Sequence, residues 1–191
     1  MSENKQLTSK ENIRRLVDGE LPLDVIHEMI RMPSKDPDRF TKYLDVLQDR
    51  VAWRERILAR ISDRLYVVAK DDGGRVVKCD CGHEFGDYRV NWKMNAQLYC
   101  RRTEHEIREV FTVHGPDHEH AEVREFYCPG CQAQLAVEVV PIGYPFVFEV
   151  LPDIDAVHLA VGAPLPDASA DWFEDRTSQL AHAWVSDGKD A

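Results

Sequence analysis

Four of the five cysteines stand in two close pairs, a spacing typical of metal ligands. Cys79 and Cys81 lie in the stretch CDCGHEF, and Cys128 and Cys131 lie in CPGC. Two tight turns that face each other can present four thiolates to one zinc ion, which accepts tetrahedral sulfur ligation. We therefore predict a structural zinc site with these four cysteines as ligands. We expect Gly130 to permit the geometry of the CPGC turn.

The cysteine pairs leave other interpretations open. A thioredoxin-like redox pair would need a helix N-terminus after the CxxC turn to lower a thiol pKa, whereas CPGC is followed by strand-forming residues. A catalytic zinc would need an open fourth position, which four thiolates close. His83, two residues after Cys81, is a spare ligand that could replace a cysteine or hydrogen-bond beside the site. Cys100 stands alone and is expected to be a small buried residue.

The ligands need strand ends and turns to hold them, and the middle of the chain supplies both. LYVVAK and RVVKC are β-rich runs joined by DDGG, which predicts a hairpin whose second strand runs into Cys79. EVREFYC and QLAVEVV predict a second β pair with CPGC at its turn. AQLYCRR predicts another strand, and Thr103 with Glu106 has capping-box spacing at the start of a short helix.

Short amphipathic helices precede this β-rich region. ENIRRLVDG and LPLDVIHEMIRM carry apolar residues at helical spacing. A further helix is predicted near 37–50, with Asp36 as its N-cap and Pro37 at its first position, and a shorter one near 53–61. The aromatic-rich stretch 144–150 is predicted to be a buried strand or part of a docking surface. DIDAVHLAV predicts a helix before a loosely patterned tail.

These patterns together predict an α+β fold. Short N-terminal helices are followed by a β-rich zinc-ribbon-like domain with a partly irregular C-terminal tail. The expected boundaries are an N-terminal helical segment at 1–62, the zinc-ribbon-like β domain at 63–151 and a C-terminal extension at 152–191.

The charge balance excludes two classes of partner. With 24 Lys and Arg against 34 Asp and Glu, the chain has a net charge of -10. Binding to nucleic acid rests on cationic groups that displace phosphate counterions, and anionic membranes attract basic surfaces, so neither partner is expected. The N-terminus lacks the apolar stretch of a secretory signal, and glutamates and prolines interrupt the most apolar region, 135–152. We expect a cytoplasmic protein, where close-set cysteines are more often metal ligands than disulfides.

A second cluster of metal-ligating residue types lies in HGPDHEH. His114, His118 and His120 alternate there with Asp117 and Glu119, a density at which a divalent metal can bind. The simpler interpretation, which we favour, is a solvated polar loop. The sequence has no phosphate-binding loop, no dinucleotide-binding glycine pattern, and no GxSxG or HExxH motif. We therefore predict no catalytic residue and no nucleotide site on this chain.

Four stretches together resemble one family, the gamma (small) subunit of acetone carboxylase, including related ketone carboxylases such as acetophenone carboxylase. The resemblance covers roughly residues 11–166, and its order and spacing agree throughout. The stretches are KDPDRFTKYLDVLQDRVAW (35–53), CDCGHEFGDYRVNWK (79–93), REFYCPGC (124–131) and YPFVFEVLPDID (144–155).

The resemblance implies a function in a larger enzyme. It implies a small zinc-binding subunit of an ATP-dependent carboxylase, a ligase that forms a carbon–carbon bond and converts acetone to acetoacetate. ATP and Mn²⁺ would lie on large alpha and beta subunits, in an assembly similar to (αβγ)₂, and the small subunit would support assembly. The zinc ligands carried over are Cys79, Cys81, Cys128 and Cys131.

Two other functions remain open from the residues alone. A free-standing zinc-ribbon protein could act as a regulatory or protein-binding adaptor, because paired cysteines also occur in such proteins. A free-standing metalloenzyme could use the histidines of the HGPDHEH loop.

Overall fold

The computed structural model describes residues 7–179 of the chain, and it begins with short helices. Ser9 caps the first of them, since its side chain accepts a hydrogen bond from the backbone N–H of Asn12 at 3.2 Å. The third helix buries Leu44, Val46 and Leu47 on one face. These helices are α2, α3 and α4, and they span Lys10–Val17, Leu23–Arg31 and Arg39–Gln48.

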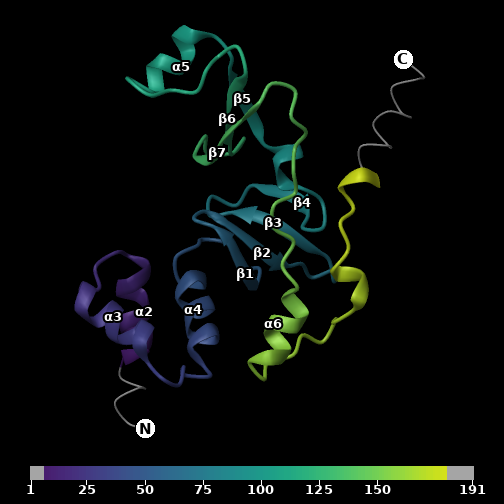
Figure 1. The fold of residues 1–191 in the computed structure, drawn as a ribbon. Helices are drawn as coiled ribbons and strands as arrows, with labels where there is room; N and C mark the ends of the chain where they lie inside the picture. The colour runs from purple at the N-terminus through teal and green to yellow at the C-terminus, as the bar shows by residue number, and fades with distance from the viewer. Residues whose placement is uncertain (1–6, 180–191) are drawn as a thin grey trace.

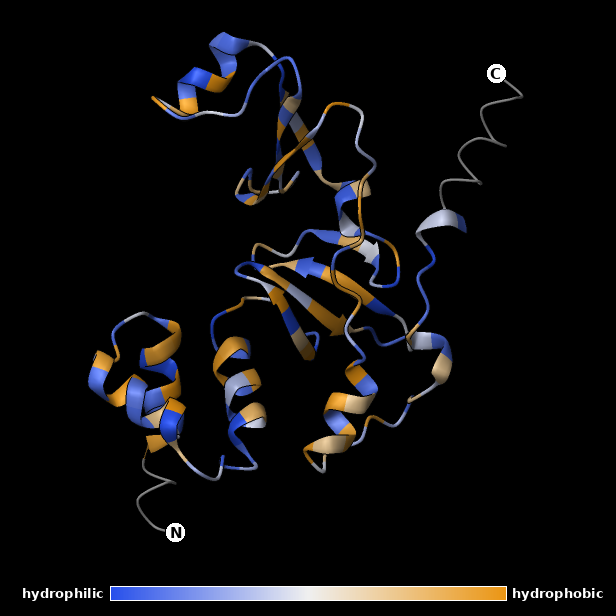
Figure 2. Ribbon diagram, viewed as in Figure 1, coloured by the Kyte–Doolittle hydropathy of each residue, from blue (hydrophilic) through white to orange (hydrophobic). Residues whose placement is uncertain are grey.

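A four-stranded antiparallel sheet follows, with its strands in the order β1-β2-β3-β4. Alternate side chains of a strand point to opposite faces of the sheet, and the second strand is buried on both of these faces. Tyr66 and Val68 pack with α4, whereas Leu65 and Val67 belong to the core on the other face. Figure 2 accordingly shows β1, β2 and β3 as largely hydrophobic. The strands span Ile57–Ser62, Leu65–Ala69, Arg75–Cys79 and Glu84–Asp87.

A second, three-stranded antiparallel sheet has the order β5-β6-β7 and lies at the end of the molecule away from α2 and α3 (Figure 1). The strands pair with Cys100 opposite Arg124 and with Phe126 opposite Ala136. Helix α5 (Glu104–Val110) connects β5 to β6 and carries the capping box of Thr103 and Glu106. The strands span Gln97–Arg101, Ala121–Tyr127 and Gln134–Pro141.

Aromatic residues join the two sheets. Trp92, in the short 3₁₀ helix η1 (Trp92–Asn95), packs edge-on between Phe85 of β4 and Phe126 of β6, with ring centroids 5.8 Å and 6.0 Å apart. Phe146, which follows β7 in the chain, also packs against the Phe126 ring, with ring centroids 5.7 Å apart. Trp92 is therefore a core residue at the junction between the sheets.

After β7 the chain returns along the first sheet. Residues 142–143 form a turn, residues 144–151 continue without regular secondary structure, and α6 (Ile154–Ala160) follows beside α4 (Figure 1). Arg75 of β3, which is buried, pairs with Asp155 at 2.7 Å and with Asp167 at 3.1 Å. Its guanidinium also stacks on Trp172, in the 3₁₀ helix η2 (Ala170–Trp172), so one arginine holds three points of the C-terminal region.

The architecture confirms the predicted α+β class and most of its elements. The DDGG hairpin, the helix near 37–50, the strand at 96–102 and the capping box are present. The short helix predicted near 53–61 is wrong, because Ile57 and Leu58 are buried in a strand that pairs with β2. The predicted strand at 144–150 does not form either, since that segment pairs with no strand among the described residues.

Two further expectations concern the domain boundaries and the absence of a membrane-spanning segment. The division into 1–62, 63–151 and 152–191 stays a prediction. Across the described part of the chain, every helix is too short or too polar to cross a membrane.

Candidate metal centre

Two hairpin turns, one from each sheet, bring four cysteines together. Cys79 ends β3 and Cys81 lies in the turn to β4, while Cys128 follows β6 and Cys131 lies in the turn to β7. The Sγ atoms of Cys79 and Cys131 are 3.9 Å apart, and those of Cys81 and Cys128 are 3.7 Å apart. All four Sγ atoms lie within 4.8 Å of one another. Tetrahedral zinc with bonds of about 2.3 Å needs sulfurs about 3.8 Å apart, so the cluster fits this metal.

Backbone hydrogen bonds fold each turn around its first cysteine. The N–H of Cys79 donates to the carbonyl of His83 at 2.8 Å, and the N–H of Cys128 donates to the carbonyl of Ala133 at 2.9 Å. Gly82 in the first turn has a φ of 99°, in the left-handed region that favours glycine, and Gln132 in the second has a φ of 59°. The local sequence thus fixes the position of each cysteine pair before the two turns meet.

Gly130 is needed for a reason other than its backbone angles. A Cβ atom at this position would lie 2.9 Å from the Cβ of His83 and 3.4 Å from the Sγ of Cys81. The absence of a side chain therefore lets the CPGC turn approach the CDCG turn closely. The positive φ of this turn falls on Gln132 and not on Gly130.

The four thiols differ in burial and in acidity. Cys79 and Cys128 are buried, whereas Cys81 and Cys131 are exposed. Burial raises the pKa of Cys79 and of Cys81, while the backbone N–H of Ala133 lowers the pKa of Cys131. Any metal that binds must therefore displace protons from Cys79 and Cys81, where burial disfavours the charged thiolate.

A tryptophan and an arginine support the first turn. The indole Nε1 of Trp53 donates to the carbonyls of Cys79 and Asp80, each at 3.2 Å. Arg64 donates to Asp80 at 2.8 Å and carries a positive charge beside Cys79 and Cys131, which would partly offset the negative charge of a four-thiolate site. Trp53 and Arg64 were missed in the sequence, because neither stands near a cysteine along the chain.

A family model described as acetone carboxylase gamma subunit matches residues 51–161, the part of the chain that holds both cysteine turns. The chain belongs to this family. The acetone carboxylase gamma subunit of Xanthobacter autotrophicus is 32% identical over 162 residues, which are 83% of this chain and 96% of that protein. The acetophenone carboxylase beta subunit of Aromatoleum aromaticum is 34% identical over 83 residues, which are 41% of this chain and 63% of that protein.

In this gamma-subunit family member, His83 lies outside the four-residue cluster. Its ring packs edge-on against Phe85, with centroids 4.9 Å apart, and its carbonyl accepts the hydrogen bond from Cys79. The geometry favours a supporting role beside the site over replacement of a cysteine.

The histidine-rich loop forms only a loose surface cluster. Asp117, Glu119 and His120 have ligand atoms within 4.8 Å of one another, and all three residues are exposed. Asp117 Oδ2 is 3.1 Å from His120 Nδ1, and the backbone N–H of Glu119 lowers the pKa of Asp117. His118 is 4.0 Å from Asp117, and His114 is not in the cluster. This arrangement is that of a hydrogen-bonded turn in solvent.

Two buried lysines flank the junction between the sheets. Lys78, next to Cys79, donates to Glu55 at 2.5 Å and to Glu84 at 3.1 Å, and the bond from Lys78 lowers the pKa of Glu55 to about 2. Lys93, in the NWK stretch, forms ion pairs with Glu138 and with Glu149. Both buried ammonium groups are therefore paired with carboxylates, as buried charges require.

Proposed function

We propose that this chain is the zinc-binding, non-catalytic gamma subunit of an ATP-dependent ketone carboxylase. The observation that carries the proposal is the cluster of four Sγ atoms, which lies within the region matched to the gamma-subunit family. The proposed ligands are Cys79, Cys81, Cys128 and Cys131. Four thiolates occupy every position of a tetrahedral ion, so the metal would hold the two sheets together and would not bind substrate.

The chemistry is assigned to partner subunits. Large alpha and beta subunits would hold ATP and Mn²⁺ and would join bicarbonate-derived carbon to the ketone, giving acetoacetate from acetone. The names of both relatives support this assignment, because each is a subunit of a ketone carboxylase. The small chain would support a cytoplasmic assembly of the (αβγ)₂ kind, with a helical segment at 1–62, the zinc-ribbon-like domain at 63–151 and an extension at 152–191.

Purification of the tagged chain from its native host tests the proposal. We expect two large proteins to co-purify with it, and we expect the complex to consume acetone only when ATP and bicarbonate are both present. Elemental analysis of the chain alone should give about one zinc per chain.

A chain that purifies alone and as a monomer would contradict the carboxylase assignment and would favour a free-standing zinc-ribbon adaptor. A well-folded chain without zinc would contradict the metal site by itself, whatever its partners are.

A further inference from the structure

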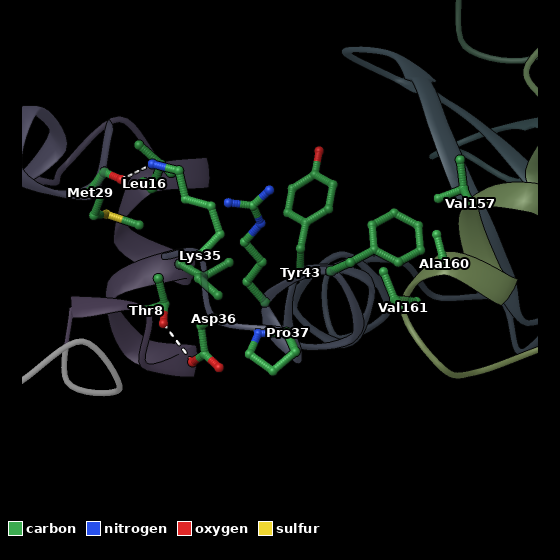
Figure 3. A pocket seen from close by; sticks show the side chains of 13 residues that line it. Thr8, Leu16, Met29, Lys35, Asp36, Pro37, Tyr43, Val157, Ala160 and Val161 are labelled. Carbon is green, nitrogen blue, oxygen red and sulfur yellow. Dashed lines mark hydrogen bonds between the residues drawn. The ribbon is translucent and has the colours of Figure 1, made fainter. Parts of the chain in front are cut away.

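A cavity lies far from the cysteines, between the helices. It has a volume of about 590 Å³. Figure 3 shows Leu16 and Met29, from α2 and α3, on one side and Val157 and Ala160 of α6, with Val161 directly after it, on the other. Tyr43 and Phe40 of α4 also line it.

This groove is apolar and open to solvent. Leu16 is 39% exposed and Val157 is 43% exposed, although both are large apolar side chains that line the groove. Ile30 and Leu159, next to lining residues along the chain, are 67% and 68% exposed. A groove lined by exposed apolar side chains marks an interaction site more often than ordinary surface.

Two of the charged side chains that line the groove have polar partners, and a third has none among the described residues. Asp36 accepts from Thr8 at 2.7 Å and pairs with Lys42 at 3.0 Å, and Lys35 Nζ donates to the last carbonyls of α3, those of Met29 and Ile30. Arg39 also lines the groove and is exposed. Within residues 7–179, no hydrogen bond or ion pair engages its guanidinium. An unpaired guanidinium beside apolar walls, in a chain with a net charge of -10, complements an anionic group on an apolar partner.

We propose that this groove holds an amphipathic helix of one large subunit, whose apolar face packs on the walls and whose Asp or Glu side chain pairs with Arg39. Helices recognised in this way place apolar residues three or four positions apart along one face, and grooves between helices accept that face. Arginine pairs with a carboxylate through two parallel hydrogen bonds, which would fix the register of the bound helix. The inference rests on the proposed function, because it requires large subunits as partners.

Filling the groove is the first test. Ala160 lines the groove and is exposed, whereas Ala156 is exposed one turn earlier on the same helix and is not part of the lining. The dissociation constant of the purified chain with the large subunits is measured for the wild type, Ala160→Trp and Ala156→Trp. We expect Ala160→Trp to weaken binding by about tenfold or more, and Ala156→Trp to change it by less than about twofold.

Charge reversal is the second test and does not change the shape of the groove. Arg39→Glu is compared with Arg54→Glu, since Arg54 is also exposed but lies in a different hollow. We expect about a tenfold loss for Arg39→Glu at low ionic strength and little change for Arg54→Glu. The loss should shrink at 1 M salt, where exposed charges are screened within about 3 Å.

The outcomes separate the inference from the function on which it rests. If the wild type binds no large subunit, the proposed function fails. If the wild type binds and both Ala160→Trp and Arg39→Glu bind equally well, the groove inference is overturned and the proposed function stands. It is also overturned if decanoate raises the melting temperature of the free chain, Ala160→Trp abolishes that rise, and assembly is unchanged. Circular dichroism and zinc content check that Ala160→Trp is folded, and if it is not, Arg39→Glu decides.

Discussion

At the scale of single residues, the burial of each cysteine sets how much its loss should disturb the protein. Cys128 is buried at the end of β6, whereas Cys131 is exposed in the turn. Binding of structural zinc commonly contributes about 10 kcal/mol or more to folding. We expect Cys128→Ser to lower the zinc content well below one per chain and to lower the soluble yield with it, as elemental analysis and expression trials would show.

Cys100→Ser is the matched control for that change. Cys100 is partly buried in β5, pairs across the sheet with Arg124 and lies outside the cysteine cluster. Replacement of its thiol should leave zinc content and yield nearly unchanged. A Cys128→Ser protein with full zinc content would exclude Cys128 as a ligand.

Gly130 provides a second test at this scale, because its missing side chain allows the two cysteine turns to approach closely. Gly130→Ala would place a methyl group 2.9 Å from the Cβ of His83, so one turn must shift. We expect zinc affinity to fall by about tenfold, the size of effect seen when groups around metal ligands are disturbed. Competition with a chromogenic chelator measures this affinity.

Pro129→Ala, in the same turn, is the control for Gly130→Ala. Pro129 is exposed, and the change removes atoms without adding any toward the other turn. An equal loss of affinity in both variants would mean that the turn's own conformation, not its close approach to the other turn, is what matters.

Asp36 makes the stability of the protein depend on pH in the acid range. The hydrogen bond from Thr8, with Lys42 beside it, holds the pKa of Asp36 well below its usual range. A carboxylate with a lowered pKa contributes stability above its unfolded value of about 3.9, and this contribution is lost as the pH falls through the folded pKa. We expect Asp36→Asn to lower the melting temperature by a few degrees at pH 7 and by progressively less below about pH 4.

Comparison of the two proteins at each pH removes effects common to both, including loss of metal in acid. Asp38→Asn is the control, because Asp38 is mostly exposed and also pairs with Lys42. A difference between wild type and Asp36→Asn that stays constant from pH 7 to pH 3 would contradict this account.

At the scale of elements, the sequence predicted what depends on local spacing. The DDGG hairpin, the capping box at Thr103 and the two cysteine turns are all set by residues within a few positions of one another. Segment 53–61 was mistaken for a helix because its strand is stabilised by pairing with β2 and by burial against α4, neither of which is visible in nine residues. Trp53 was missed for the same reason, since its partners are 26 and 27 residues away.

Arg75 connects β3 to the C-terminal region and makes the docking of α6 testable. It is fully buried and pairs with Asp155 and Asp167. Removal of one partner of a buried ion pair costs about 3 kcal/mol or more. We expect Arg75→Met to lower the free energy of unfolding by about this amount and to increase hydrogen exchange at α6.

Arg89→Met is the control, because Arg89 also stacks on Trp172, at 4.5 Å, but forms its ion pair with Asp87, two residues away. It should leave exchange at α6 unchanged. If hydrogen exchange at α6 increases equally in both variants, the docking of α6 depends on Trp172 and not on the ion pairs of Arg75.

At the scale of the whole molecule, the cysteine cluster and the Trp92 stack both join the sheets. Removal of the metal should therefore act on the junction more than on the interior of either sheet. We expect a chelator to increase hydrogen exchange at residues 79–84 and 128–134, while β1 and β2 stay protected by their contacts with α4.

Mass spectrometry of exchanged peptides resolves these regions, and re-addition of zinc should restore the original pattern. Uniform loss of protection along the whole chain would mean that the metal is needed for the fold as a unit. The sequence alone could not distinguish the two cases, because it predicts which residues bind the metal and not what else joins the sheets.

Segment 142–151, which lacks regular secondary structure, has a consequence for the chain before it meets any partner. Ile142, Tyr144, Val147 and Val150 are exposed there. None of the backbone N–H groups from 146 to 151 hydrogen-bonds to a described backbone carbonyl outside regular helices and strands. Chaperones and proteases select extended apolar segments of this kind on newly made chains. An unassembled copy should therefore be degraded quickly. We expect the level of this chain to be low in cells that lack the large subunits.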